Sequence, residues 1–141
     1  MISVGIDEVQ MKSVEAIMRE MLEIQQKSKR FIELISADEP FSQTQLVLLL
    51  QLKLSGGMKA TEIAQFFQVT PGAVTSMCDK LENIGLIERV RESSDRRVVQ
   101  MMLTASGEDK VTELFTKFPE EKLAEMAKVL SEVNQLMSRI F

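Results

Sequence analysis

An abrupt change of periodicity at Gly85 is the feature that most constrains the fold of this chain. Before it, apolar residues recur with helical spacing, at Val74, Met77, Cys78, Leu81 and Ile84. After it, residues 86–91 and 98–103 have the composition of two strands around a polar tip at 92–97. Glycine at the point of change supplies a helix stop. The sequence therefore predicts a helix followed directly by a β-hairpin.

A second helix is predicted just before this one. Residues 60–67 carry apolar side chains with helical spacing, and a few residues separate them from Thr70. Thr70 suits a helix cap, and Pro71 suits the first helical position. Two helices joined by such a short turn make a helix-turn-helix, and the hairpin behind them makes it winged. We expect a mainly α-helical fold with a small β-hairpin wing.

Further helices are predicted on both sides of this unit. Residues 6–35 form one long amphipathic helix, and residues 43–54, capped by Ser42, form a helix that we expect to be buried nearly all round. Thr104 caps a helix over 105–118, and Pro119 opens a last helix. Apolar residues of close to heptad spacing follow along that last helix: Leu123, Met126, Ala127, Leu130, Val133, Met137 and Ile140.

We expect a single domain, residues 1–141, that works as a homodimer. Its winged helix-turn-helix lobe would cover 42–103, with dimerisation helices at 1–36 and 105–141. A helix of about 30 residues spans about 45 Å, more than the diameter of such a domain, so a partner would cover part of its stripe. Bundle packing within a monomer is the alternative. The residues that we expect at the dimer interface are Val14, Ile17, Leu123, Leu130, Val133, Met137 and Ile140.

The second helix of a helix-turn-helix enters the major groove of DNA with the face opposite its core stripe. On that face we expect Thr75 and Ser76 to bond bases or phosphates and Lys80 to contact a phosphate. Short side chains at the helix start permit close approach of the phosphate backbone. The alternative is a set of ordinary solvated positions. The candidates on this segment are Thr70, Gly72, Thr75, Ser76 and Lys80.

The hairpin tip carries two adjacent arginines, Arg96 and Arg97. One can enter a minor groove while the other pairs with Asp95 and stiffens the tip. The net charge of −4 argues against a polyanionic partner for the chain as a whole, but residues 89–97 form a local positive spot. A charged, solvated turn is the alternative. The candidate DNA contacts on the hairpin are Arg89, Arg91, Asp95, Arg96 and Arg97.

A family resemblance rests on this region. Asp95-Arg96-Arg97, with Leu103-Thr104 and then Gly107 behind it, resembles the signature of MarR-family regulators, and residues 70–75 and 81–89 are similar to that family's recognition helix and first wing strand. The resemblance implies an obligate dimer with interlocking first and last helices, a palindromic operator in double-stranded DNA, and a possible small aromatic or lipophilic anionic effector. Two positions depart from the family. Ser76 stands where many relatives carry arginine, and Lys59 where serine or threonine often caps, so we expect weaker or more salt-sensitive DNA binding.

The function that we expect is a DNA-binding transcriptional regulator, and a repressor because promoter occlusion needs nothing beyond binding. A winged-helix ligand-sensing or protein-interaction module without DNA binding is the alternative, which the acidic balance and Ser76 keep open. An enzyme is the weakest hypothesis, because the chain has no histidine and no carboxylate pair stands out. We expect no metal or other cofactor, no membrane segment and a cytoplasmic location.

The single cysteine, Cys78, invites a redox-sensor hypothesis. Its place on the apolar stripe favours a core role instead, because a thiol in apolar surroundings has a raised pKa and little thiolate.

Overall fold

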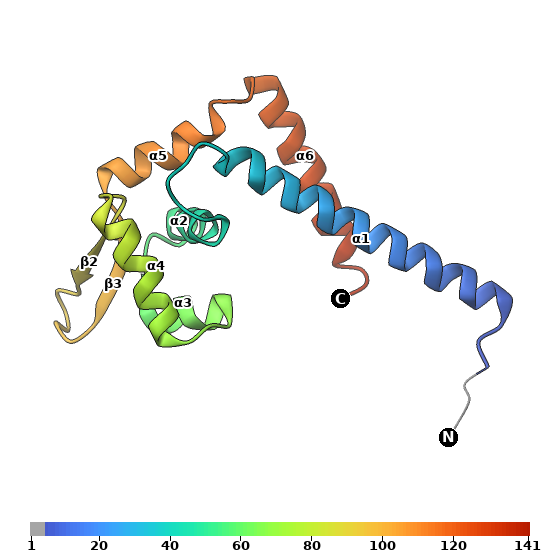
Figure 1. Cartoon of the computed structure of the whole chain (residues 1–141), viewed down its shortest axis with the longest axis horizontal. Coiled ribbons are helices and arrows are strands. Elements are labelled where there is room, and N and C mark those ends of the chain that lie inside the picture. The colour runs from blue at the N-terminus through green and yellow to red at the C-terminus, as the bar shows by residue number, and fades with distance from the viewer. Residues whose placement is uncertain (1–4) are drawn as a thin grey trace. The chain divides into compact units, whose positions relative to one another are not determined.

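The computed structural model describes residues 5–141. They divide into two compact units, residues up to Asp38 and residues from Glu39 onward. The first unit holds the helix α1 (Glu8–Ser36). The second unit (Figure 1) holds α2 (Gln43–Ser55), β1 (Met58–Lys59), α3 (Ala60–Phe67), α4 (Pro71–Asn83), β2 (Ile87–Arg91), β3 (Val99–Leu103), α5 (Ala105–Phe115) and α6 (Glu120–Met137).

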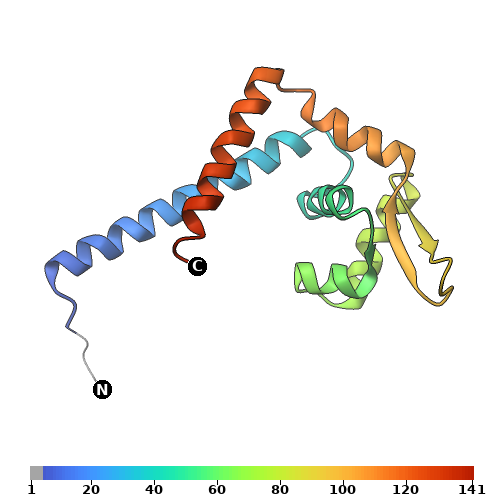
Figure 2. The same cartoon turned by 180° about the vertical axis from the view of Figure 1, so that it is seen from behind.

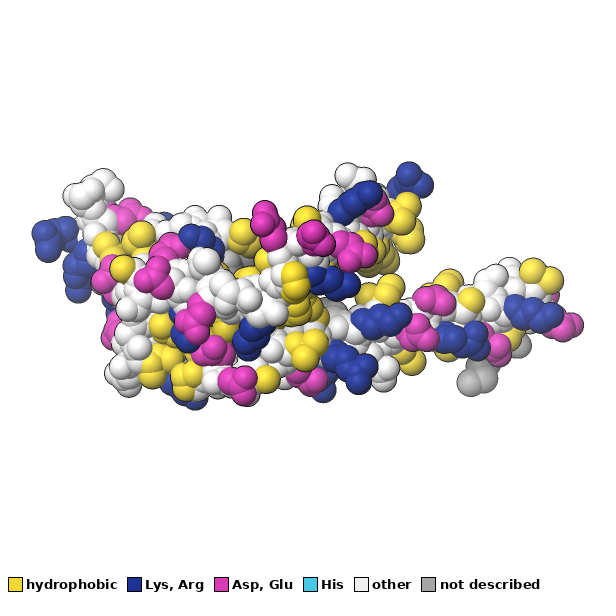
Figure 3. All heavy atoms as spheres, turned by 90° about the horizontal axis from the view of Figure 1, so that it is seen from above, with side chains coloured by type: hydrophobic (Ala, Val, Ile, Leu, Met, Phe, Trp, Pro, Cys, Tyr) yellow, Lys and Arg dark blue, Asp and Glu magenta, His cyan; other side chains and the backbone are white. Residues whose placement is uncertain are grey.

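The long helix α1 begins at a capping box and is largely exposed. The Asp7 carboxylate accepts a hydrogen bond from the Gln10 backbone N–H at 2.7 Å, and the Gln10 side chain accepts one from the Asp7 N–H at 3.2 Å. Ile35 is the buried residue of this helix, whereas Ile17 and Met21 are 63% and 58% exposed. Figure 3 shows apolar side chains interspersed with charged ones along α1. The predicted apolar stripe exists and lies mostly open to solvent.

The core of the second unit is built around α2. Ser42 and Gln45 form its capping box, and the helix buries four leucine side chains: Leu46, Leu48, Leu49 and Leu52. Leu54, by contrast, is 83% exposed, so the prediction of burial nearly all round is wrong at this end. It follows Leu52 by two positions and therefore points about 200° further round the helix.

The wing belongs to a three-stranded antiparallel sheet with the order β1-β3-β2. Arg89 of β2 and Met58 of β1 flank Met101 of β3 on opposite sides. The hairpin β2–β3 confirms the two predicted strands, but β1 was not predicted. A strand of two residues has no alternation that a sequence pattern can reveal.

The start of α5 packs tightly against the beginning of the wing. The Thr104 hydroxyl accepts a hydrogen bond from the Gly107 N–H at 3.0 Å and donates one to the Gly85 carbonyl oxygen at 2.6 Å. A Cβ atom at Gly107 would overlap the Leu86 carbonyl oxygen. Glycine is therefore required here by the close approach of two backbones, which gives the Thr104 and Gly107 of the family signature a structural role.

The last two helices lead away from the sheet. In Figure 2, α5 follows β3 directly and α6 continues from its far end. α5 ends at Phe115, three residues before the predicted end. α6 ends at Met137. The prediction that the apolar seam of this helix continues to Ile140 is therefore wrong, because Ile140 lies beyond the helix. No helix among the described residues is long and apolar enough to cross a membrane.

Candidate nucleic-acid interface

The turn between α3 and α4 sets the start of the candidate recognition helix. Gln68 takes a left-handed conformation with φ of 53°, which ends α3. The Thr70 hydroxyl then accepts a hydrogen bond from the Ala73 N–H at 3.2 Å, and Pro71 occupies the first turn of α4. Thr70, a candidate DNA contact, thus acts as a helix cap in this structure.

One face of α4 is anchored in the core. Val74, Cys78 and Leu81 are at most 1% exposed, and Met77 is half-buried. Ile84 was predicted to extend this stripe but is 39% exposed and lies just past the helix as its C-cap residue. The helix ends here because Gly85, the next residue, adopts φ of 82° and turns the chain toward β2. Ile84 therefore lies outside the helical stripe that faces the core.

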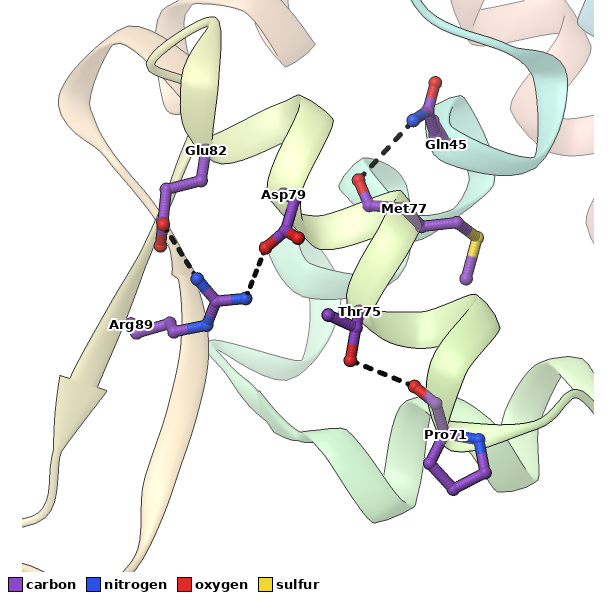
Figure 4. Close-up of polar contacts among 7 residues, drawn as sticks. All are labelled: Gln45, Pro71, Thr75, Met77, Asp79, Glu82 and Arg89. Carbon is purple, nitrogen blue, oxygen red and sulfur yellow. Dashed lines mark hydrogen bonds and ion pairs between the residues drawn. The ribbon is translucent and has the colours of Figure 1, made fainter.

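The opposite face of α4 presents small and polar side chains to solvent. Gly72, Thr75, Ser76 and Lys80 are all exposed, as predicted. The Thr75 hydroxyl donates to the Pro71 carbonyl oxygen at 3.1 Å (Figure 4). Among the described residues, the side chains of Ser76 and Lys80 have no hydrogen-bond or ion-pair partner. These two side chains are therefore available to a ligand outside the chain.

A buried glutamine ties α4 to α2. Gln45 is 5% exposed, and its Nε2 donates to the Met77 carbonyl oxygen at 3.4 Å (Figure 4). Its Oε1 accepts from the Ser42 N–H at 2.8 Å. This role of Gln45 was not predicted. The available signal was the Ser-x-x-Gln spacing of a capping box, but that spacing gives no hint of a contact with α4.

At the wing tip, Arg97 pairs with Asp95. The Arg97 Nε lies 3.0 Å and its Nη2 lies 3.1 Å from the two carboxylate oxygens, and the Arg97 backbone N–H also donates to Asp95. The Arg97 side chain therefore holds the pKa of Asp95 below its usual range. The Arg97 side chain is 91% exposed and that of Asp95 is 39% exposed, so solvent screens the pair. The structure thus forms the predicted pair between Asp95 and one of the two adjacent arginines.

Arg96 has a different environment from its neighbour. Its carbonyl oxygen accepts a hydrogen bond from Arg91 Nη1 at 2.8 Å. Its guanidinium has no hydrogen-bond or ion-pair partner among the described residues. Figure 3 shows Lys and Arg side chains projecting from the wing, at the left. Of the two adjacent arginines, Arg96 is therefore the one whose guanidinium is available to a partner outside the described residues.

The guanidinium of Arg89 in β2 is bonded to α4 while its side chain remains partly exposed. Its Nη2 lies 2.8 Å from Asp79 Oδ1, and its Nη1 lies 2.7 Å from Glu82 Oε1 (Figure 4). The hydrogen bond to Asp79, followed by the charge of Glu82, raises the Arg89 pKa above its usual value. Arg89 was predicted to contact DNA, and in this structure both arms of its guanidinium are occupied within the chain.

Cys78 is fully buried on the core face of α4. Burial raises the pKa of its thiol, and the nearby Arg89 charge opposes that shift only in part. Little thiolate forms at neutral pH under these conditions, which agrees with the predicted core role.

Comparison with known proteins shows which family this winged helix-turn-helix resembles. Residues 41–99, from just before α2 to the first residue of β3, match the model of the MarR family. In this region the chain is therefore similar to the MarR family. The HTH-type transcriptional repressor MdtR of Bacillus subtilis is 41% identical to it over 87 residues, which cover 62% of this chain and 54% of MdtR. The chain thus aligns with little more than half the length of that relative.

Solved structures of MarR-family proteins share the fold. A MarR family protein from Bacillus stearothermophilus superposes with a TM-score of 0.67 at 23% identity, over 95% of this chain and 99% of the other. A mutant of MarR from E. coli, in complex with operator DNA, superposes with a TM-score of 0.56 at 21% identity, over 86% and 95% of the two chains. At these identities the likeness establishes the winged-helix fold.

Proposed function

We propose that this chain is a DNA-binding transcriptional regulator of the MarR family and not an enzyme. The observation that carries the proposal is the pairing of a core-anchored α4, whose outer face is small and polar, with a wing whose Arg96 guanidinium is free. The names of MdtR, a transcriptional repressor, and of the MarR complex with operator DNA support it. Reaching an operator requires that the chain act in the cytoplasm.

The two elements would read DNA in different ways. α4 would enter the major groove, with Ser76 and Lys80 contacting bases or phosphates and Gly72 permitting close approach. Arg96 would enter the adjacent minor groove or bind its phosphates. The Asp95–Arg97 pair and the hydrogen bond from Arg91 to the Arg96 carbonyl would hold the tip in shape. These roles do not require a positive net charge, because they rest on local groups.

The regulator would be a repressor that binds a palindromic operator as a homodimer. Support comes from the helices outside the wing lobe, which expose large apolar side chains. Ile17 of α1 is 63% exposed, and Leu130 and Met137 of α6 are 54% and 41% exposed. A run of exposed large apolar side chains along a helix is typical of an interaction surface. A second copy would cover it and would hold two α4 helices for two half-sites.

Release from DNA by a small aromatic or lipophilic anion would complete the regulation. The family resemblance supports this step. Titration of the bound operator with salicylate-like and lipophilic carboxylates, followed by fluorescence anisotropy, tests it.

The proposed function is tested by selecting the purified chain against a random duplex library and measuring affinity for the enriched sequence at two salt concentrations. We expect a palindrome and a strong salt dependence. Arg96→Ala should weaken binding to it by about 1 to 3 kcal/mol, with the matched Arg96→Lys variant in between.

A folded, dimeric protein that enriches no sequence would contradict the proposal. That result would support the alternative of a ligand-sensing or protein-interaction module. The net charge of −4 is the observation that favours this alternative.

A further inference from the structure

Three charged side chains link the wing to the recognition helix. Asp79 and Glu82 lie three residues apart on α4 and so share one side of the helix. Arg89 reaches both from β2, with one nitrogen of its fork on each carboxylate, at 2.8 and 2.7 Å. Figure 4 shows the guanidinium lying between the two carboxylates. We call Asp79, Glu82 and Arg89 the wing clamp.

The chemistry of the wing clamp suits a structural bridge between two elements. A guanidinium is planar and offers several donors, so it can bond two carboxylates at once, which an ammonium point charge does less well. The Arg89 and Glu82 side chains are 35% and 38% exposed and that of Asp79 is 53% exposed, so solvent reaches the bridge mainly from the Asp79 side. The trio carries a net charge of −1, which would repel DNA phosphates rather than attract them. A direct phosphate contact by Arg89 would first have to break this bridge.

We propose that Arg89 is a positioning residue that acts through Asp79 and Glu82 to hold the wing at a fixed place relative to α4. The hydrogen bonds of the chain reversal at Gly85 fix only the base of β2, where the Leu86 N–H donates to the Leu81 carbonyl oxygen at 3.0 Å. Ile87 and Met101 also bury the base of the hairpin in the core, and the wing clamp adds a polar attachment two residues into the strand. It thereby sets the spacing between the two parts that, under the proposed function, read DNA.

The test uses the double variant Asp79→Ala/Glu82→Ala. Alanine is the strongest helix former, so α4 is preserved while both acceptors are lost. The variant also removes two negative charges from a surface that faces DNA. If Arg89 contacts DNA directly, operator affinity should rise, because the freed guanidinium and the lost repulsion both favour binding. If the wing clamp positions the wing, affinity should fall despite the favourable charge change.

We expect the double variant to bind the operator about tenfold more weakly at 0.1 M salt, about the effect of losing one phosphate contact. Because the variant removes two negative charges, charge alone would strengthen binding instead. Arg89→Ala in this background should change affinity less than twofold, roughly the limit for groups that no longer interact. The matched control is Glu88→Gln, which removes a negative charge beside Arg89 without touching the wing clamp. It should leave affinity equal or higher. Tighter binding by the double variant would overturn the proposal.

A readout without DNA separates this proposal from the proposed function. Hydrogen exchange of the β2 and β3 amides should be faster in the double variant and unchanged in Glu88→Gln, with equal melting temperatures for both. Unchanged exchange in the double variant would also overturn the proposal. If the wild-type chain binds no duplex while the exchange result holds, the wing clamp stands and the proposed function fails.

Discussion

The helices α1 and α4 are both capped and amphipathic, yet only α4 has its apolar stripe covered. Along the 29 residues of α1, Ile35 is buried, whereas the 13 residues of α4 bury Val74, Cys78 and Leu81. The sequence patterns of the two stripes are alike. Periodicity therefore identifies an apolar helix face but not the segment or partner that packs against it. For α4 the cover is the core of its own unit. For α1 we propose a second copy of the chain.

The largest expected effect falls on the covered stripe. Leu81→Ala should lower the free energy of unfolding by about 2 to 5 kcal/mol, because a fully buried leucine leaves a cavity. Urea unfolding followed by circular dichroism measures this. The control is Ile84→Ala, which removes an apolar side chain from the exposed C-cap and should cost about 0.5 kcal/mol or less. Equal costs would mean that the stripe extends to Ile84 after all.

A smaller loss is expected where the stripe carries sulfur. Cys78→Ser should lower the free energy of unfolding by about 1 to 3 kcal/mol, because the buried hydroxyl lacks the partners that water gives it. Peroxide treatment should change the operator affinity of the wild type and of the variant to the same degree. Peroxide-induced release that disappears in Cys78→Ser would contradict the core role of this residue.

The uncovered stripe of α1 should respond in association rather than in folding. Ile17→Glu should raise the dimer dissociation constant at least about tenfold, or 1.4 kcal/mol, because it places a charge in an apolar interface. Sedimentation equilibrium measures the change, and Ile17→Leu is the conservative control. An unchanged dimer would show that the α1 stripe is not its interface, and the comparison with α4 would need another explanation.

The helix caps provide the finest test of the comparison. Thr70→Ala should lower the stability of the second unit by about 1 kcal/mol, because α4 loses the acceptor for its Ala73 N–H. Asp7→Ala removes the equivalent cap of α1, whose first turns are exposed, so the helix end should fray with little effect on global unfolding. Amide exchange distinguishes the local loss from the global one. A global effect of Asp7→Ala would mean that the start of α1 is covered.

Much of the fold was predictable because its signals are local. Ser42, Thr70 and Thr104 all cap helices as predicted, and Gly85 ends α4 where the periodicity changes. The sequence also predicted that one of the two adjacent arginines pairs with Asp95, because neighbours in one turn meet without help from the rest of the chain. The structure shows that this arginine is Arg97. The exposure of Ser76 and Lys80 followed from helical geometry alone.

The wrong predictions concern ends and partners. Leu54 and Ile84 continue an apolar pattern beyond the point where the helix still faces the core, and Ile140 continues one beyond the end of α6. The strand β1 and the bond from Gln45 to Met77 were missed, because both join segments far apart in the sequence.

The sequence by itself determined the order of the helices and of the two wing strands, the caps at Ser42, Thr70 and Thr104, and the pairing of Asp95 with an adjacent arginine. Each of these depends on residues a few positions apart, whose relative placement the backbone fixes through φ, ψ and helical or strand periodicity. Only the tertiary structure decided that Arg89 faces Asp79 and Glu82. A pattern of alternating faces tells which side of β2 an arginine occupies, but the distance from that side to α4 depends on how the chain reverses at Gly85 and packs against Gly107.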